Sequence, residues 1–262
     1  QLKGASKADR RTLKVYSRGN VEKMHSSENR NDLHAEIETL PFSIETSELV
    51  TVQRMGAAIP VLLIRADLAM RKCYFVCLND YIDKILVPRH GDYTKKASRT
   101  IHIPSWNDLS QPEIGINALR WYAKRVKLFA AFQKFIYQHV ELSYAIDRAE
   151  FRRLAQHFAL LLANYDFWTD TPLWCPIQYY GAALQRFLNE GQPGLTQINE
   201  AAVTQAAQDD QERLHEIKNH LADTDVMELW RCLSVLPRNY EELCREWFLP
   251  TSLGLDTSYN PD

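Results

Sequence analysis

Two kinds of hydrophobic pattern divide this chain of 262 residues. Up to about residue 105, apolar residues come in short blocks between polar stretches, which is typical of β-strands joined by loops and helices. From Gly115 onward, apolar residues recur at three- and four-residue spacings, which is typical of helices that face a core. The pattern therefore predicts an α/β part followed by an all-α part.

The first part is expected to form a sheet with one well-marked helix. Strands are predicted over residues 13–17, 40–44, 59–64, 73–78 and 100–104. The third of these is continuously apolar, so we expect it to be covered on both faces. Thr46 can cap a helix that ends at Gly56. The polar residues 20–33 are interpreted as a flexible loop, and residues 82–99 as a basic connection.

The second part is expected to be helical throughout. Helices are predicted over residues 116–144, 148–167, 177–188, 227–236 and 240–247. Gly191 ends the third helix, and Pro237 separates the last two because proline removes a backbone donor and clashes with the preceding turn. Residues 200–222 carry few apolar side chains, and residues 250–262 are expected to form a mobile tail.

Charge is distributed unevenly between the two parts. Residues 1–110 hold 17 Lys and Arg against 13 Asp and Glu, whereas residues 111–262 hold 14 against 20. A basic part and an acidic part suggest two units with different partners. We therefore predict an α/β domain over residues 1–108, a helical regulatory or oligomerisation domain over 115–250, and a flexible tail over 251–262.

The cysteine content and the hydropathy of the chain indicate which cellular compartment to expect. The five cysteines are odd in number and include no CxxC pair, so neither a disulfide framework nor a zinc knuckle is expected. Cys73 and Cys77 lie about 13 Å apart on a predicted strand and are interpreted as core residues. No apolar run is long enough to span a bilayer, and no leader opens the chain. We expect a cytoplasmic protein without a membrane partner.

The candidate chemistry begins at the first residues, Gln1-Leu2-Lys3-Gly4. On a strand, Gln1 and Lys3 share one face. Phosphodiester hydrolysis needs a divalent cation, for which a glutamine carbonyl is a possible ligand beside a carboxylate, and a lysine can stabilise the transition state. The alternative is that Gln1 and Lys3 occupy a solvent-facing strand end without a catalytic role.

A longer stretch of sequence carries a family resemblance. "QLKG", followed by "LPFSIETSELVTVQRMGAAIPVLLIRADLAMRKCYFVCLNDYI", resembles a bacterial domain-of-unknown-function family (4365) of the PD-(D/E)XK, restriction-endonuclease-like superfamily. In that family a Q-x-K motif is followed by a strand, a helix, an apolar strand, an aromatic strand and an "IHIP"-like segment. The resemblance covers about residues 1–105 and implies part of a restriction-endonuclease-like mixed sheet.

The resemblance also implies an activity and its residues. Gln1 would match the metal-proximal glutamine and Lys3 the catalytic lysine of a nuclease that uses Mg²⁺ or Mn²⁺. The family's helix glutamate and hairpin aspartate would precede Gln1, and since no Met opens the chain we expect it to be a portion of something longer. The polar insertion after Lys14 departs from the family pattern. Family membership implies a role in bacterial defence against phage or plasmid DNA, with other protein subunits.

Basic residues could bind nucleic acid, which we predict to be DNA, beside such a site. The candidate set is Lys7, Arg10, Arg11, Lys14, Lys95, Lys96 and Arg99. A further basic stripe consists of Arg120, Lys124, Lys127 and Lys134. For both sets the alternative is a solvated surface. The aromatic segment 165–180 is interpreted as a packing centre, with a recognition patch as the alternative.

Three functions stay open at this point. The first is a metal-dependent nuclease whose helical part docks partners or oligomerises. The second is a catalytically incomplete subunit that binds nucleic acid or serves as a scaffold in a defence complex. The third is a helical interaction protein with an accessory sheet. The residues preceding Gln1 in the full reading frame would distinguish the first from the second.

Overall fold

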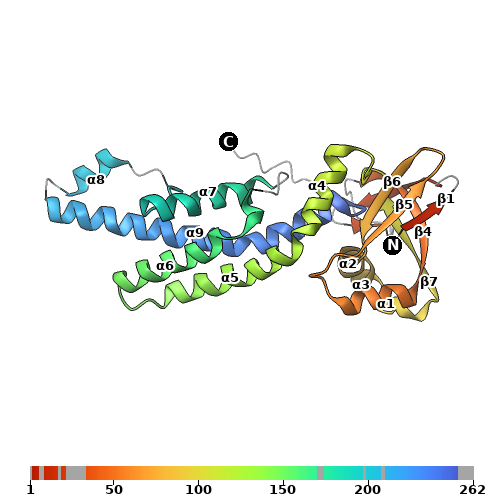
Figure 1. The fold of residues 1–262 in the computed structure, drawn as a ribbon, viewed down its shortest axis with the longest axis horizontal. Helices are drawn as coiled ribbons and strands as arrows, with labels where there is room; N and C mark the ends of the chain where they lie inside the picture. Colours follow the sequence, from red (N-terminus) through yellow and green to blue (C-terminus); the bar gives the residue numbers. More distant parts are fainter. Residues whose placement is uncertain are drawn as a thin grey trace. The chain divides into compact units, whose positions relative to one another are not determined.

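The computed structural model describes residues 2–5, 9–16, 19–21, 34–169, 174–196, 199–207 and 210–252. The chain combines small β-sheets with a large helical part, as the hydrophobic pattern predicted (Figure 1). It divides into two compact units. The first comprises Gln1–Arg125 with Tyr240–Asp262, and the second comprises Val126–Asn239. In the described part, no helix is both long and apolar enough to cross a membrane.

The first sheet of unit 1 has the order β1-β5-β6. Its strands are β1 (Leu2–Ala5), β5 (Leu62–Asp67) and β6 (Lys72–Cys77). β5 runs parallel to β1 and antiparallel to β6. β5 alternates buried and half-buried residues and begins at Leu62, so the predicted start at Ile59 was wrong. Pro60 cannot donate to a ladder, and the Val61 N–H donates to the Asn79 side chain at 2.7 Å instead.

The second sheet of unit 1 is antiparallel and has the order β2-β4-β7. Its strands are β2 (Arg11–Tyr16), β4 (His34–Glu45) and β7 (Ser98–Pro104). β4 extends well before the predicted start at Leu40, because its first half pairs with β2. One face of this sheet packs a small core around Val15 and Ile37, and the other contributes Leu40 and Ile101 to the main core. A short pair, β3 (Gly19–Asn20) and β8 (Thr251–Ser252), completes the β-structure described.

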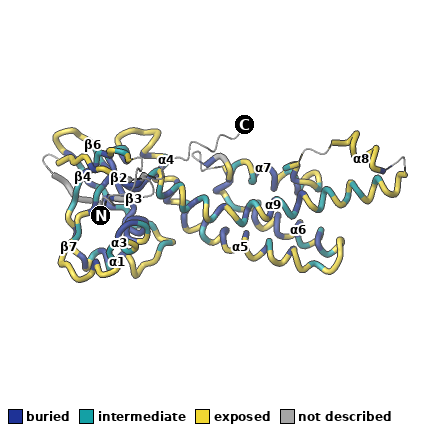
Figure 2. Tube along the Cα trace, turned by 180° about the vertical axis from the view of Figure 1, so that it is seen from behind, coloured by how far each residue is buried: buried dark blue, intermediate teal, exposed yellow. Residues whose placement is uncertain are grey.

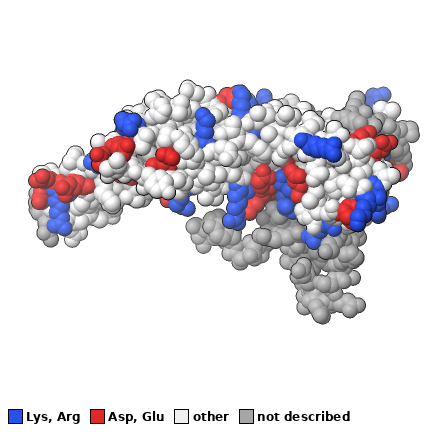
Figure 3. All heavy atoms as spheres, turned by 90° about the horizontal axis from the view of Figure 1, so that it is seen from below, with Lys and Arg blue, Asp and Glu red and all other residues white. Residues whose placement is uncertain are grey.

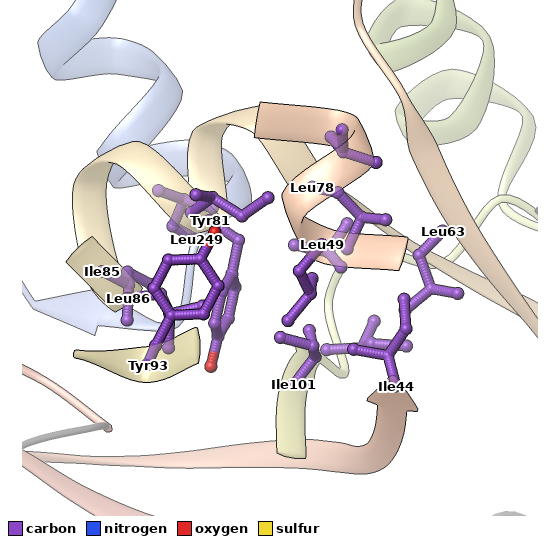
Figure 4. Packing of buried hydrophobic residues seen from close by; sticks show 14 of the residues in the cluster. Ile44, Leu49, Leu63, Leu78, Tyr81, Ile85, Leu86, Tyr93, Ile101 and Leu249 are labelled. Atoms are coloured by element: carbon purple, nitrogen blue, oxygen red, sulfur yellow. The ribbon is translucent and has the colours of Figure 1, made fainter. Parts of the chain in front are cut away.

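Helices cover the main core of unit 1. Helix α1 (Thr46–Met55) ends at Gly56, whose φ of 77° favours glycine, as predicted. The segment predicted as a basic connection, residues 82–99, is instead helical at its start. It contains a π-helical turn η1 (Ile82–Leu86) and α3 (Val87–Arg89), which continue α2 (Leu78–Tyr81), and then the 3-10 turn η2 (Tyr93–Lys95). The correction has a simple cause. Leu78, Tyr81, Ile82, Ile85 and Leu86 lie on one helical face and are buried in the main core (Figure 4).

The long helix predicted over 116–144 is two helices, α4 (Pro112–Ala123) and α5 (Arg125–Ser143), with Lys124 between them. They are followed by α6 (Arg148–Ala163), the 3-10 turn η3 (Asp166–Trp168), α7 (Cys175–Glu190) and α8 (Glu200–Ala207). α7 ends as predicted at Gly191, which is left-handed at φ 78°. Unit 2 buries the inward sides of its helices and exposes the outward sides (Figure 2).

The last helix, α9 (Gln211–Phe248), runs through Pro237 without a break. The prediction of two short helices was therefore wrong. Leu233, Leu236, Tyr240 and Cys244 are buried at helical spacing on both sides of the proline. Because packing supplies most of the stability of a protein helix, these contacts offset the one backbone hydrogen bond that proline removes. The predicted tail lies outside the described residues from residue 253 onward, and so does most of the predicted loop, residues 22–33.

Candidate functional site

The predicted catalytic pair can be located only in part. Gln1, the predicted metal ligand, and Lys7 lie outside the described residues. The backbone of Lys3 lies on β1, where its register partner on β5 is Arg65. Arg65 in turn pairs with Tyr74 on β6. Lys3, Arg65 and Tyr74 therefore form one row across the sheet, with backbones spaced about 5 Å from strand to strand.

The middle of this row is a buried cation. Arg65 is 7% exposed, and its guanidinium donates to the Pro41 carbonyl at 2.5 Å and lies over the Phe42 ring at 6.0 Å. Two residues further along β5, Asp67 is also buried and accepts a hydrogen bond from the Met70 N–H at 3.0 Å. Asp67 is the register partner of Ala5, so a carboxylate stands one strand away from the end of β1.

Around Tyr74 lies a set of paired charges, which we call the Tyr74 cluster; its members are Arg10, Glu38, Lys72, Tyr74 and Asp108. Arg10 pairs with Glu38 at 2.6 Å and donates to the Tyr74 hydroxyl at 2.8 Å. Lys72 pairs with Asp108 at 2.7 Å. Arg10, which was predicted to bind DNA, therefore contacts Tyr74, a member of the same row as Lys3. Its guanidinium already pairs with the carboxylate of Glu38.

Protonation in the Tyr74 cluster follows from burial and these pairs. Burial raises the pKa of Tyr74, and the positive charge of Arg10 opposes that rise. Burial by itself would raise the pKa of Asp108, but hydrogen bonds from Lys72 and Ser110 lower it overall. The hydrogen bond between Lys72 and Asp108 raises the pKa of Lys72. The cluster therefore holds a neutral phenol between two charge-balanced pairs at neutral pH.

The other predicted nucleic-acid-binding residues form two separate groups. Arg11 and Lys14 are exposed on β2, and Lys14 faces Glu36 across the ladder. Lys95 and Lys96 are exposed near the start of β7, together with the half-buried Arg99. Arg11 pairs with Thr39 on β4 and Arg99 with Ile44, so the groups stand about 17 Å apart along that strand.

His102 lies on β7, where its register partner on β4 is Pro41. Burial, together with the positive charge of Arg11, lowers the pKa of His102 to about 4. The ring Nδ1 lies 3.4 Å from the Thr39 hydroxyl, and the backbone N–H of His102 donates to the Tyr81 hydroxyl at 3.2 Å. The imidazole is therefore neutral at physiological pH.

The most heavily buried charges in unit 1 were not identified from the sequence. Arg125 has no exposed side-chain surface and donates to Asp80 at 2.5 Å. Asp80 also accepts hydrogen bonds from Lys84 at 2.8 Å and from Tyr122 at 3.2 Å. Arg125 donates from Nε to the Tyr240 hydroxyl at 3.0 Å. We call these five residues the Asp80 network.

The Asp80 network keeps its charges at neutral pH. Burial would raise the pKa of Asp80, but Lys84 and Arg125 lower it overall. Burial also raises the pKa of the neighbouring thiols, Cys77 and Cys244, to about 12. Their sulfurs lie 3.6 and 3.5 Å from the Arg125 guanidinium nitrogens. Neutral thiols of this kind are packing residues rather than nucleophiles.

Unit 2 offers a shallow cavity of about 520 Å³ between the end of α5, the start of α6 and α9. Its lining includes Phe151, Met227 and the Arg148–Asp223 ion pair, which spans 2.7 Å. The predicted basic stripe does not lie on one helix: Arg120 is on α4, Lys124 follows that helix, and Lys127 and Lys134 are on α5. Lys127 pairs with Asp166 at 2.8 Å. The aromatic segment is a packing centre at Phe167, Trp168 and Trp174, which are buried.

Two further findings concern metal binding and similarity to known proteins. Among the residues that the structure describes, no three His, Cys, Asp or Glu side chains come together as a metal site. Gln1 is not among these residues. Comparison with protein-family models, with curated proteins and with solved structures finds no match.

Proposed function

We propose that this protein is a metal-dependent nuclease acting on DNA, and an effector in a bacterial anti-phage or anti-plasmid defence complex. The observation that carries the proposal is the row Lys3–Arg65–Tyr74, with Arg10 on the Tyr74 hydroxyl. The order of elements adds support: β1, which contains the lysine of the Q-x-K motif, shares a sheet with the apolar β5 and the aromatic β6, and these two strands follow the helix α1 along the chain. This is the order of the family that the sequence resembles.

In this proposal Lys3 stabilises the negative charge that develops on the phosphate during cleavage. Arg10 and the exposed Arg11 bind neighbouring phosphates of the same strand. The described residues do not complete a site for Mg²⁺ or Mn²⁺. The proposal therefore requires acidic ligands in a segment before Gln1, to act together with the Gln1 carbonyl.

The test is a Lys3→Ala substitution in the full-length protein, assayed for Mg²⁺-dependent cleavage of plasmid DNA. We expect cleavage to fall by about 100-fold or more, the usual effect of removing one charge-stabilising group. Lys218→Ala is the matched control, because Lys218 is a surface lysine of α9 in the other unit. Undiminished cutting by Lys3→Ala would show that the catalytic assignment is wrong.

A second candidate is a subunit that binds nucleic acid without cutting it, or serves as a scaffold. It is favoured by the exposure of Arg11, Lys14, Lys95 and Lys96 and by the acidic partner that Arg10 already has. Such a protein would bind DNA with Mg²⁺ or Mn²⁺ present and leave it intact. An Arg11→Ala/Lys14→Ala variant should then bind more weakly, with a salt slope smaller by about 2, since each phosphate contact contributes about 1.

A further inference from the structure

Helix α5 presents apolar side chains to solvent as well as to the core of unit 2. Its inward positions are filled by buried residues such as Leu128 and Phe135. Its outward positions include Val126, which is 51% exposed, and Val140, which is 45% exposed; Tyr144, directly after the helix, is 74% exposed. A surface helix ordinarily carries polar residues on its outward side, so this face is unusual for a helix that packs only against its own unit.

The outward residues have the spacing of a coiled-coil seam. Alternately four and three positions apart, they are Val126, Ala130, Gln133, Tyr137, Val140 and Tyr144, all exposed. This alternation is the heptad repeat, which keeps side chains in line with a second helix over about 27 Å here. We call these six residues the α5 seam. Gln133 is its one amide, and a single polar residue within a seam specifies register and orientation.

We propose that the α5 seam packs against the α5 seam of a second copy of this chain, with the two helices antiparallel. In this arrangement Val126 faces Tyr144 of the second copy, and Ala130 faces Val140. Gln133 faces Tyr137. Each layer joins a smaller side chain to a larger one, so the two helices can approach evenly along the seam. Because the pairing is two-fold, one patch serves both copies and the interface closes without leaving an unpaired seam.

Charge beside the seam selects the antiparallel direction. Lys127 and Glu141 occupy the same heptad position, two heptads apart, on one flank. Antiparallel helices place Lys127 of each copy opposite Glu141 of the other, at both ends of the interface. Parallel helices would place this flank opposite Phe129, Ile136 and Ser143, which offer no charge.

One charge of α5 opposes this pairing, because Lys134 of each copy would face Lys134 of the other at the centre of the flank. Lys134, midway along the flank, lies over the Tyr165 ring of its own unit, with Nζ 5.8 Å from the ring centroid. Lys127 also pairs with Asp166, but both side chains are about half exposed, so that pair contributes little. The view from below shows a group of acidic side chains at the far left end and separate charged side chains elsewhere over the helical unit (Figure 3). The inference does not depend on the proposed nuclease activity.

Sedimentation velocity of the whole chain over roughly 1–100 µM tests the seam, a range in which a weak dimer dissociates. We expect the wild-type mass to approach twice 30.4 kDa. Val140→Glu should raise the dissociation constant at least about tenfold, because it buries a carboxylate in an apolar seam. Val235→Glu on α9 is the matched control, since Val235 is an exposed valine (49%) outside the seam, and it should leave the mass unchanged. Circular dichroism checks that each variant keeps its helices.

Four further variants test the interpretation. Tyr144→Lys changes a residue so exposed that folding is unaffected, and it should also weaken the dimer. Lys127→Glu and Glu141→Lys should each weaken it, and the double variant should restore it only if the helices are antiparallel. A wild-type mass of 30.4 kDa throughout, or equal effects of Val140→Glu and Val235→Glu, would overturn the seam. Failure of the double variant to recover would overturn the antiparallel pairing.

Discussion

The two units of this protein bury different kinds of side chain. Among the described residues, ten of the twelve buried polar or charged side chains belong to unit 1. Unit 2 contributes Gln138 and Asp225, and otherwise buries aliphatic and aromatic residues. In unit 1, then, the fold must supply a partner for each buried charge, whereas unit 2 needs mainly complementary shapes.

Because of this difference, substitutions should reduce the stability of the two units by different mechanisms. A buried ion pair adds little net stability, because desolvation offsets its attraction, yet removing one member leaves an uncompensated charge. An apolar core responds instead through the cavity that a truncation leaves. The Asp80 network in unit 1 and the aromatic core around Trp230 in unit 2 represent these two cases.

Breaking the Asp80 network should have the largest effect. Asp80→Ala removes the carboxylate that accepts from Arg125, Lys84 and Tyr122, and leaves the Arg125 guanidinium buried without an anion. We expect the free energy of unfolding to fall by about 3–5 kcal/mol, as measured by urea denaturation. The control is Asp92→Ala, an exposed acid of the same unit paired with Lys95 at 3.5 Å. If Asp80→Ala lowers the free energy of unfolding no more than Asp92→Ala does, the buried charges are not essential to the stability of unit 1.

Truncating the core of unit 2 should have the next largest effect. Leu233 is fully buried on α9, four residues before Pro237. Leu233→Ala should cost about 3 kcal/mol through the lost transfer energy and the cavity. Val235→Ala, at an exposed site of the same helix, should cost far less. Thermal unfolding followed by circular dichroism compares them, and equal shifts in Tm would contradict a core specified by packing.

Acid should distinguish the units through His102. Its folded pKa of about 4 lies below the ordinary value of 6.5, so between these values the unfolded state binds the extra proton. The stability contribution is therefore present above pH 6.5 and is lost as the pH falls toward 4, by at most about 1 kcal/mol per pH unit. Urea midpoints at several pH values measure this slope. His102→Gln should flatten it, and His157→Gln, at an exposed position of unit 2, is the control for the substitution itself.

The smallest effect should come from an exposed ion pair. Lys127 and Asp166 pair at 2.8 Å in unit 2, and both side chains are about half exposed. Lys127→Ala should change the free energy of unfolding by less than about 0.5 kcal/mol. Urea denaturation at low and high salt measures it. A loss comparable to that of Asp80→Ala would show that burial is not what makes an ion pair of this protein matter.

Local sequence signals predicted many boundaries and failed where distant contacts intervened. Gly56 and Gly191 end helices as expected, since a left-handed or similar backbone is a local requirement. Residues 82–99 were expected to be a connection because their charges obscured a short apolar face at the start of the segment. The helix through Pro237 depended on burial of Tyr240 and Cys244 in the first unit, which no local rule contains.

The candidate site shows the same limit. The motif at Gln1 and Lys3 and the basic residues were visible in the sequence, and the restriction-endonuclease-like sheet remains a prediction. Arg10 was identified as basic, but its partners Glu38 and Tyr74 lie 28 and 64 positions away. Register between β1, β5 and β6 is what placed Lys3 in the same row as Tyr74.

The sequence by itself determined the mixed class, the change from short apolar blocks to helical periodicity, and the glycines that end two helices. These depend on residues within a few positions of one another. Only the tertiary structure decided which charges are buried and with what partners, as for Arg125 and Asp80, which are 45 positions apart. The physical reason is that burying a charge is tolerable only where it gains a partner, and for Arg125 and Asp80 that partner comes from a distant segment, which depends on the packing of the whole unit.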